Sequence, residues 1–543
     1  MTPLDDVDSR KLFFKRIFHV DDPCRVELEE VSTKILKKCG GLPLAIITFA
    51  SLLANKTHKK DEWERLHDSI GTGPSLDNDE DYKIKCKELK WKWMAEGFLD
   101  RRWGHLDEVA ENCINELVNR NMIQPIDSYD DGTVKYCRVH DMVLDLIIFL
   151  SDEENFATVL NGRVCNSFPN KIRRLSVQVS GKEHNGAVCA ITETKICVRS
   201  LTIFRQVEQI PHLVDFHALR VLDLGVCEWL ENKHVKHIGS LRQLRYLRIG
   251  RSNITELPCE IGKLQHLETL DLRCCYSLPR LPSTVAQLRK LVHLFVSNST
   301  QLPASGFRSL QALEELRFWE TDDPVRFAEE VNESGKCNLR YLRTDGEIVE
   351  HLFCNPRCTY PCLQVLKIHS GIGMLPRGMT SLENLMKLHI MFTEFDKEDL
   401  QVLMGMPSLA HLDLKIIEGA INEKLIIGSD GFKLLKVFHF CYTPFGSAFE
   451  VKPMGGLRLT FAPDLGVEHL PGLAQLKVEI NCYRAAPGRA KALECSIEKA
   501  ATLLPKCRIR VSRSLESCMF KDDKKWEEFV AKRISGEERR QEE

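Results

Sequence analysis

The sequence predicts an α/β solenoid of stacked repeats with the shape of a horseshoe, preceded by a helical segment and a winged helix. Three observations support this prediction. From residue 219 onward, a six-residue phrase with apolar residues at its first, fourth and sixth positions returns at a nearly constant interval. Residues 83–139 have the pattern of two helices followed by a β-hairpin. Residues 27–54 have the pattern of two helices with a glycine break between them, and the second helix is apolar on most sides.

The interval between the phrases identifies the type of repeat. The phrases begin at ten leucines, namely Leu219, Leu244, Leu267, Leu291, Leu313, Leu339, Leu363, Leu385, Leu409 and Leu435. The intervals are 25, 23, 24, 22, 26, 24, 22, 24 and 26 residues. An L-x-x-L-x-L phrase that recurs every ~20–29 residues is the signature of leucine-rich repeats. Among these ten phrases, Thr344 is the one polar residue at a sixth position.

Less regular phrases extend the array in both directions. They begin at Ile172, Val198 and Leu473, and they bring the count to about a dozen repeats. Each phrase predicts a short strand whose apolar residues face the core, while the residues between them face the concave side. Residues 490–511 predict a helix and a last strand that cap the array. The charged residues from 512 onward predict a frayed helix or a disordered tail.

The segment ahead of the repeats predicts helices and one hairpin. Two glycines before Leu42 end the first helix, and Pro43 begins the next, where its missing N–H costs nothing. Helices are expected over 83–95 and 107–121. The pair Asp131-Gly132 predicts a tight turn between two strands that end at Val139. Asp141 is a candidate N-cap of the helix that follows. Two helices and a two-stranded wing form the pattern of a winged helix.

Composition excludes several classes of function. The formal net charge is −2, so no global field attracts nucleic acid or an anionic membrane. Residues 1–10 hold no apolar run, and no segment approaches the ~20 apolar residues of a membrane span, so neither a signal peptide nor membrane insertion is expected. The 21 cysteines are scattered without zinc spacing, which predicts reduced thiols and no metal. We expect a cytoplasmic protein, with the plasma-membrane surface and the nucleus as alternatives.

Three phrases ahead of the repeats carry a family resemblance. They are CGGLPLA at 39–45, WKWMAEGFL at 91–99 and VHDMVLDLI at 139–147. In this order, ahead of leucine-rich repeats, they resemble plant intracellular immune receptors of the nucleotide-binding, leucine-rich-repeat family, in its coiled-coil class. The second phrase resembles the winged-helix segment of that family. The first resembles the GLPL motif and the third resembles the MHD motif, and the matching residues are Gly41, Leu42, Pro43 and Leu44, and Val139, His140 and Asp141.

The resemblance implies a division into four parts. Residues 1–75 correspond to a remnant of the helical subdomain of the nucleotide-binding module, known as NB-ARC, and residues 76–155 to the winged-helix domain. Residues 156–511 correspond to the repeat domain with its cap, and residues 512–543 to the charged tail. On this resemblance the chain is the back part of a receptor.

The resemblance also implies a nucleotide site for ADP or ATP. In the family, the proline of the GLPL motif packs against the adenine and the histidine of the MHD motif reaches toward the ADP phosphates, which here correspond to Pro43 and His140. Asp141 would support the fold. The sequence contains no G-x-x-x-x-G-K-[ST] phosphate loop, so we expect a truncated receptor that does not hydrolyse ATP. The alternatives are a helix-start role for Pro43 and a capping role for His140.

One column of concave-face residues is a candidate binding surface. It contains Arg317, Arg343, Lys367 and His389, one from each of four consecutive phrases. Neighbouring strands lie ~4.8 Å apart, so these cations repel one another unless a partner meets them. We expect them to contact an acidic surface of a protein ligand or of another immune receptor. The alternative is a solvated face that is neutralised by Glu314 and Glu315.

These observations predict a recognition protein and not an enzyme. The repeats would recognise a pathogen effector or a host protein in plant innate immunity and regulate an ADP/ATP switch that is incomplete here. The alternatives are a substrate receptor of a ubiquitin ligase and a general protein-interaction scaffold. DNA is not an expected partner, because Arg120 is the only cation in the second helix of the winged segment.

Overall fold

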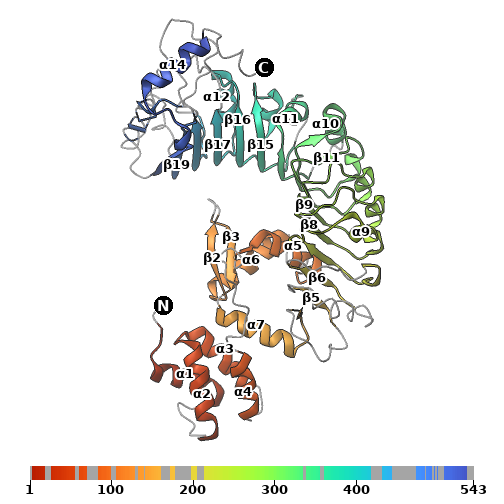
Figure 1. Ribbon diagram of the computed structural model, residues 1–543, viewed down its shortest axis with the longest axis vertical. Coiled ribbons are helices and arrows are strands. Elements are labelled where there is room, and N and C mark those ends of the chain that lie inside the picture. Colours follow the sequence, from red (N-terminus) through yellow and green to blue (C-terminus); the bar gives the residue numbers. More distant parts are fainter. Residues whose placement is uncertain are drawn as a thin grey trace. The chain divides into compact units, whose positions relative to one another are not determined.

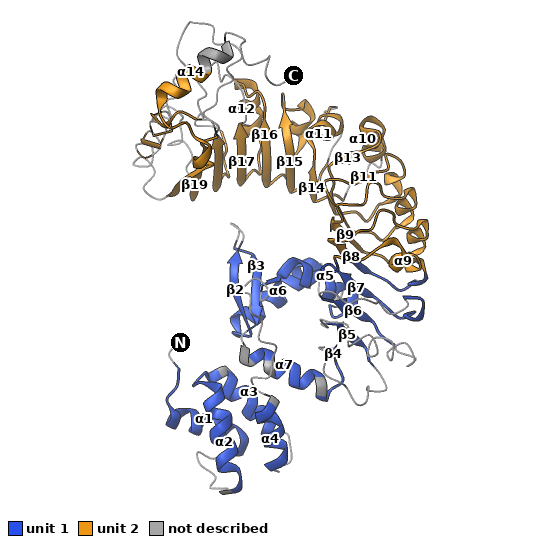
Figure 2. Ribbon diagram, viewed as in Figure 1, with its two compact units in different colours: residues 1–227, 240–247 blue, residues 228–239, 248–543 orange. Residues whose placement is uncertain are grey.

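The fold is described from a computed structural model, which divides into two units (Figures 1 and 2). Unit 1 contains residues 1–227 and 240–247, and unit 2 contains residues 228–239 and 248–543. The boundaries expected near residues 75, 155 and 511 stay predictions. The described residues are 3–18, 26–54, 60–69, 83–99, 106–128, 132–139, 141–160, 172–177, 197–204, 213–333, 338–354, 360–416, 431–442, 472–483, 485–488, 490–491, 494–495, 498 and 507–534.

Four helices at the start of unit 1 share one apolar core. They are α1 (Asp6–Phe18), α2 (Val26–Cys39), α3 (Pro43–Ala54) and α4 (Lys60–Ser69). Helix α1 packs against α3, and α2 packs against α4. At the centre the rings of Phe13 and Trp63 meet edge to face with their centroids 5.8 Å apart, and both residues are fully buried. The predicted break between two helices is confirmed, since α2 ends before Gly40 and α3 begins at Pro43.

A winged helix follows in unit 1. Its elements are β1 (Ile84–Lys85), α5 (Cys86–Glu96), α6 (Leu106–Asn119), β2 (Ile123–Ser128) and β3 (Val134–Val139), and helix α7 (Asp141–Glu153) comes next. The three strands form an antiparallel sheet with β3 in the centre, in which Ile84 pairs with Cys137 and Ile123 pairs with Val139. Both predicted helices and the predicted hairpin are confirmed, but the first helix begins at Cys86 and not at residue 83, because residues 84–85 pair with β3 as a third strand. Helix α7 begins at Asp141, but the side chain of Asp141 lies outside the described part of the structure.

The repeat phrases form one parallel sheet (Figure 1). Its strands in chain order are β4 (Thr158–Leu160), β5 (Arg174–Val177), β6 (Ser200–Ile203), β7 (Val221–Leu224), β8 (Tyr246–Gly250), β9 (Thr269–Cys274), β10 (His293–Val296), β12 (Glu315–Arg317), β14 (Tyr341–Thr344), β15 (Val365–Ile372), β16 (Lys387–Phe392), β17 (His411–Ile416), β18 (Val437–Tyr442), β19 (Gln475–Asn481) and β20 (Arg508–Ser514). The predicted array is confirmed, including the irregular phrases that begin at residues 172, 198 and 473.

The register of the sheet keeps equivalent phrase positions side by side. The fourth-position Leu270 pairs with Leu294, Leu294 pairs with Leu316, and the same pairing continues to Leu412 and beyond. These leucines are buried on the core face of every strand. Because side chains alternate along a strand, the residues on either side of each fourth position point to the opposite face. The sheet of unit 2 therefore presents columns of equivalent residues on that face.

Short helices return the chain between most of the strands, and Figure 2 shows those of unit 2 on the outer side of that unit. Pro258, Pro282 and Pro376 each precede a 3-10 helix with φ of −64°, −66° and −60°, the angle that a proline ring imposes. The connecting elements are η3 (Leu213–Asp215), α9 (Asn232–Val235), η4 (Ile238–Ser240), η5 (Cys259–Lys263), η6 (Ser283–Gln287), β11 (Gln301–Leu302), η7 (Phe307–Ser309), β13 (Glu320–Thr321), α10 (Pro324–Glu333), α11 (Gly346–Leu352), η8 (Arg377–Ser381) and α12 (Lys397–Met404).

The C-terminal segment contains more regular structure than its charge suggests. The last predicted strand is confirmed as β20, while most residues of the helix expected before it lie outside the described part of the structure. Beyond β20 come η11 (Glu516–Cys518) and α14 (Asp523–Ile534). The side chain of Asp523 accepts the N–H of Gly488 at 2.8 Å, and the rings of Phe520 and Phe529 lie 5.2 Å apart. These contacts attach α14 to the end of the array, so the charged sequence is ordered here by a few specific contacts.

A helix that spans a membrane must be both long and apolar. None of the helices described in the structure is both long enough and apolar enough to cross a bilayer.

The buried hydroxyl of Thr344 gives a testable prediction about the stability of the repeat core. Its side chain is 0% exposed at the sixth phrase position, and its hydroxyl has no hydrogen-bond partner among the described residues. An unsatisfied buried hydroxyl is destabilising, whereas valine has nearly the same shape. We expect Thr344→Val to raise the free energy of unfolding by about 1 kcal/mol in a urea titration. A lower stability would show that the hydroxyl has a partner.

Candidate functional site

The sheet places the predicted basic column on four neighbouring strands. Arg317 of β12 pairs in register with Arg343 of β14, Arg343 pairs with Lys367 of β15, and Lys367 pairs with His389 of β16. All four residues are partly exposed, because the residues before and after each of them are buried on the core face of the strand. The structure therefore brings together the residues that the sequence selected. Their role in binding stays a prediction.

Arg317 and Arg343, at one end of this column, both contact the ring of Trp319. The guanidinium carbon of Arg317 lies 4.7 Å from the ring centroid of Trp319, and that of Arg343 lies 5.3 Å from the same centroid. The imidazole of His369 lies 4.9 Å from Trp319, centroid to centroid. We call Arg317, Trp319, Tyr341, Arg343 and His369 the Arg–Trp cluster. Cation–π contacts of this kind hold the arginines in place and keep them on the concave face.

The protonation of His369 follows from its partner. Nε2 of His369 lies 2.6 Å from Nη2 of Arg343. A guanidinium can only donate, so the imidazole nitrogen must be the acceptor and the ring must be neutral. Burial, and then the charges of Arg343 and Arg317, lower the pKa of His369. His369 therefore positions Arg343 without adding a third positive charge to the cluster at neutral pH.

Arg317 is held at an electrostatic cost. Burial, and then the neighbouring charge of Arg343, lower the pKa of Arg317 to about 10. Arg317 stays protonated at neutral pH, but its charged form is less stable than in water. Its Nε is buried and has no hydrogen-bond partner among the residues that the structure describes. A carboxylate brought to this place would offset the repulsion between the arginines and supply acceptors to their N–H groups.

The His389 end of the column differs from the arginine end. The carboxylate of Asp413 on β17 accepts a hydrogen bond from Nδ1 of His389 at 2.8 Å. The same carboxylate lies 3.2 Å from Nδ1 of His439 on β18. Burial alone would raise the pKa of Asp413, but the hydrogen bonds and charges of the two histidines outweigh it and lower that pKa. His389 thus belongs to a His–Asp–His network. Asp413 and His439 occupy the same phrase position as His389 in the next two repeats, but the sequence could not show this pairing.

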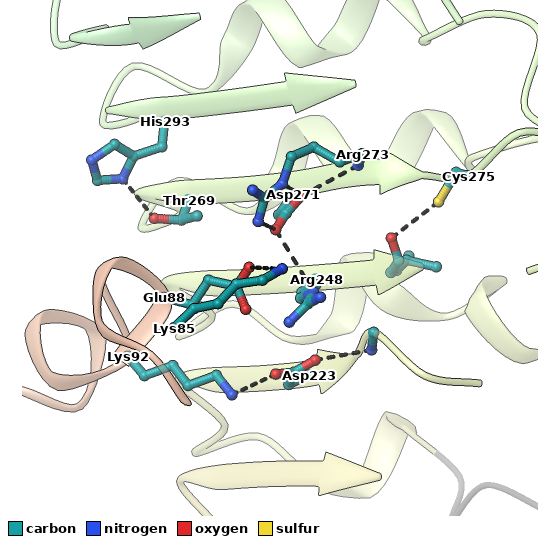
Figure 3. Close-up of polar contacts among 12 residues, drawn as sticks. Lys85, Glu88, Lys92, Asp223, Arg248, Thr269, Asp271, Arg273, Cys275 and His293 are labelled. Atoms are coloured by element: carbon teal, nitrogen blue, oxygen red, sulfur yellow. Dashed lines mark hydrogen bonds and ion pairs between the residues drawn. The ribbon is translucent and has the colours of Figure 1, made fainter. Parts of the chain in front are cut away.

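Two acidic residues on the repeats, Glu314 and Asp271, pair with arginines that do not belong to the predicted basic column. Glu314 lies in the phrase of Arg317, yet its carboxylate pairs with Arg340 at 3.5 Å. Farther along unit 2, the buried Asp271 accepts the guanidinium of Arg273 at 2.6 Å and lies 3.7 Å from Arg248 (Figure 3). These acids already have cations of their own. Glu314 thus has a cationic partner outside the column.

A second polar site lies in unit 1, where the WKWMAEGFL phrase meets the first repeats. Lys92 on α5 pairs with the buried carboxylate of Asp223 on β7 at 2.5 Å (Figure 3). Glu96 pairs with Arg174 on β5 at 3.1 Å, and the Glu96 carbonyl accepts an N–H of Arg220 at 2.9 Å. The guanidinium of Arg174 also lies over the rings of Phe98 and Phe156, at 4.7 and 4.1 Å from their centroids.

These contacts explain the spacing within the phrase. Lys92 and Glu96 are four residues apart, so they lie on one face of α5, and both face the repeats. Gly97 then ends the helix with φ of 84°, a conformation that glycine adopts without strain. The sequence contained the i, i+4 signal, but it could not show that the partners are Asp223 and Arg174.

The GLPL residues have structural roles in the helical part of unit 1. Gly41 has φ of 71°, and its carbonyl accepts the N–H of Leu4 at 2.7 Å. A Cβ at Gly41 would lie 2.3 Å from the Leu4 carbonyl oxygen, so only glycine fits. Leu42 packs against the helical core, and Pro43 opens α3, as its helix-start alternative requires. His140 lies outside the described residues. Nucleotide binding by Pro43 and His140 stays a prediction.

Among the residues that the structure describes, no group of three or more His, Cys, Asp or Glu side chains could hold a metal ion.

Arg120 is the cation that the sequence singled out in the second helix of the winged segment. It pairs with Glu116 at 2.5 Å on the exposed side of α6.

Comparisons with known proteins agree with the fold. The family model described as leucine-rich repeat region matches residues 197–352 and 337–509, and the model described as disease resistance protein winged helix domain matches residues 79–147. Disease resistance protein Pik-2 of Oryza sativa is 29% identical, over 88% of this chain and 59% of its own length. Disease resistance protein RGA5 of the same species is 26% identical, over 93% of this chain and 53% of its own length.

The chain thus spans a little more than half the length of these relatives. Among solved structures, the plant peptide hormone receptor RGFR1 in complex with RGF2 matches with 15% identity and a TM-score of 0.33, over 57% of this chain and 51% of the receptor chain.

The Glu96–Arg174 pair should stabilise unit 1. The substitution Glu96→Gln leaves the mostly buried charge of Arg174 without its counter-ion, and breaking a buried pair in this way costs about 3 kcal/mol. We expect this loss in the free energy of unfolding of unit 1, followed by circular dichroism in urea. Glu116→Gln is the control, because its pair with Arg120 is exposed and should change stability by under about 0.5 kcal/mol. Equal effects of the two variants would contradict the assignment.

The His–Asp–His network should make stability depend on pH. The pKa of Asp413 is lowered in the folded state, so its stabilising effect is present above the ordinary value near 4 and is lost as the pH falls through the lower folded value. Asp413→Asn should therefore be less stable than wild type at pH 7, and the difference should shrink below about pH 4. Urea titrations from pH 3 to 7 measure this. The exposed Asp215→Asn is the control, and a difference that is constant with pH would exclude the network.

Proposed function

We propose that this chain, which belongs to the nucleotide-binding, leucine-rich-repeat disease resistance proteins of plants, is a recognition module that binds an acidic protein surface on unit 2. The ligand would be a pathogen effector, a host protein or another immune receptor. The relatives are disease resistance proteins, which favours a role in plant defence over a ubiquitin-ligase substrate receptor or a general scaffold. The chain would act by binding and not by catalysis.

The observation that carries this proposal is the position of Trp319 between two arginines. Arg317 and Arg343 are in register on neighbouring strands, and both contact the same indole ring. Tryptophan, tyrosine and arginine are the residue types enriched at the energetic centres of protein interfaces. Tyr341 is half-buried beside them, and burial raises the pKa of its hydroxyl, which remains a neutral hydrogen-bonding group.

The charge of the ligand follows from the electrostatics of the Arg–Trp cluster. The lowered pKa of Arg317 reflects burial and then repulsion from Arg343, both of which an approaching carboxylate would offset. A bidentate pair between a guanidinium and a carboxylate is the strongest ionic hydrogen bond available here. The cluster therefore supports a ligand that presents aspartate or glutamate side chains.

Two further predictions of the family resemblance remain proposals. ADP or ATP binding would involve Pro43 and His140, and the described contacts of Gly41, Leu42 and Pro43 are accounted for by helix packing alone. A cytoplasmic location, with the plasma-membrane surface or the nucleus as alternatives, rests on the family and on composition.

Charge reversal tests the proposed surface. The triple variant Arg317→Glu, Arg343→Glu, Lys367→Glu should lose at least about 90% of ligand binding, because a tenfold loss needs only ~1.4 kcal/mol and each reversal replaces an attraction by a repulsion. The measurement is quantitative mass spectrometry of the proteins that co-purify with the tagged chain from infected and uninfected plant tissue, at 0.1 M and 0.5 M salt.

The matched control reverses three exposed cations elsewhere on unit 2, in Arg289→Glu, Arg326→Glu, Lys436→Glu. It changes the net charge by the same amount and should retain the ligand. An identical set of bound proteins for wild type and the cluster variant would disprove the proposed function.

A further inference from the structure

Two buried thiols meet inside the winged helix. Cys86 is the first residue of α5, and Cys137 lies on β3, the central strand of the three-stranded sheet. Their exposed fractions are 1% and 0%. Both side chains belong to one apolar cluster with Ile114, Ile123 and Val134. The two cysteines come from segments far apart in the sequence and share the same small core.

Strand pairing fixes this proximity. Ile84 on β1 pairs with Cys137, and Lys85 pairs with Tyr136. The chain then turns into α5, so the side chain of Cys86 enters the core next to the strand that carries Cys137. The two thiols are hydrogen-bonded to each other. A disulfide needs two cysteines that are close together and whose side chains face each other, and these two side chains point into one small core.

The two thiols are not chemically equivalent. The hydrogen bond from Cys86 lowers the pKa of Cys137, against the opposing effect of burial. The hydrogen bond with Cys137, followed by burial, raises the pKa of Cys86. Cys137 is thus the thiol that more readily gives a thiolate, and Cys86 keeps its proton and donates it. Thiolate character decides which cysteine reacts first with an oxidant.

We propose that Cys86 and Cys137 form a reversible disulfide when a peroxide oxidises the winged helix, and that this bond locks the start of α5 to β3. The Cys137 thiolate attacks one peroxide oxygen, the O–O bond breaks, and the other oxygen leaves as hydroxide. The Cys86 sulfur then attacks Sγ of the resulting sulfenic acid, and the second hydroxide leaves. It takes up the Cys86 proton and becomes water. The peroxide is reduced and the two thiols are oxidised, with two electrons transferred in total.

Burial makes the reaction depend on motion of the domain. A peroxide reaches the thiols only when the winged helix opens locally, since both are inaccessible in the closed form. Once formed, the bond opposes the same opening. Strand β3 ends at Val139, two residues after Cys137, and α7 begins at Asp141. The lock therefore fixes the strand that leads directly into the MHD-like residues.

The test uses the full chain, first reduced and then exposed to hydrogen peroxide. Remaining thiols are blocked with N-ethylmaleimide, and the protein is digested without reduction for mass spectrometry. We expect a linked peptide pair that contains Cys86 and Cys137 and that disappears with dithiothreitol. Its rate of formation should level off at high peroxide concentration and rise several-fold in ~1 M urea, because opening limits the reaction. Amide exchange over residues 84–139 should slow about tenfold after oxidation.

Variants separate the lock from general oxidation. Cys86→Ala and Cys137→Ala should each lose the linked pair and the slowed exchange, whereas Cys113→Ala on α6 should retain both. The result for wild type stands by itself if a variant fails to fold. The proposal is overturned if Cys86 and Cys137 are recovered unlinked after the exposed Cys259 and Cys518 have been oxidised. Links to other cysteines, or unchanged amide exchange in the linked form, would overturn it as well.

Discussion

The in-register stacking of parallel strands is the constraint on which the rest of the structure depends. Each repeat contributes apolar residues that cannot be buried alone, and burial requires the next repeat to align its own apolar positions beside them. A slip of one residue would turn the leucines to the concave face. The same alignment forces equivalent residues on the other face into columns. Arg317 therefore meets Arg343 because Leu316 meets Leu342.

The strand register also places charged residues side by side, and the candidate binding surface lies where these charges interact. Arg317 and Arg343 repel each other, and Trp319 and His369 hold both in place. At His389 the repetition is broken by Asp413, which accepts hydrogen bonds from histidines on both neighbouring strands. In unit 1, Lys92 on α5 forms an ion pair with Asp223 on β7. Each of these arrangements uses the regular spacing of the strands to position a polar group.

Much of the fold follows from the sequence, because a repeat period specifies strand positions and register together. The column from Arg317 to His389 could be predicted for the same reason. The indole between the arginines and the neutral state of His369 could not, since they depend on side-chain conformations. Nor could the pairing of Glu96 with Arg174, which joins residues 78 apart in the chain. The thiol pair in the winged helix was hidden among 21 scattered cysteines until strand pairing placed two of them together.

The central claim is that the Arg–Trp cluster binds carboxylates presented by a protein. The most direct measurement is a titration of the purified full chain with a glutamate-rich peptide, followed by the NMR signal of the Trp319 indole N–H and assigned with Trp319→Phe. We expect a saturable shift of this signal that weakens as salt is raised, with no shift for a lysine-rich peptide of equal length. An unchanged Trp319 signal, or equal shifts with both peptides, would contradict it.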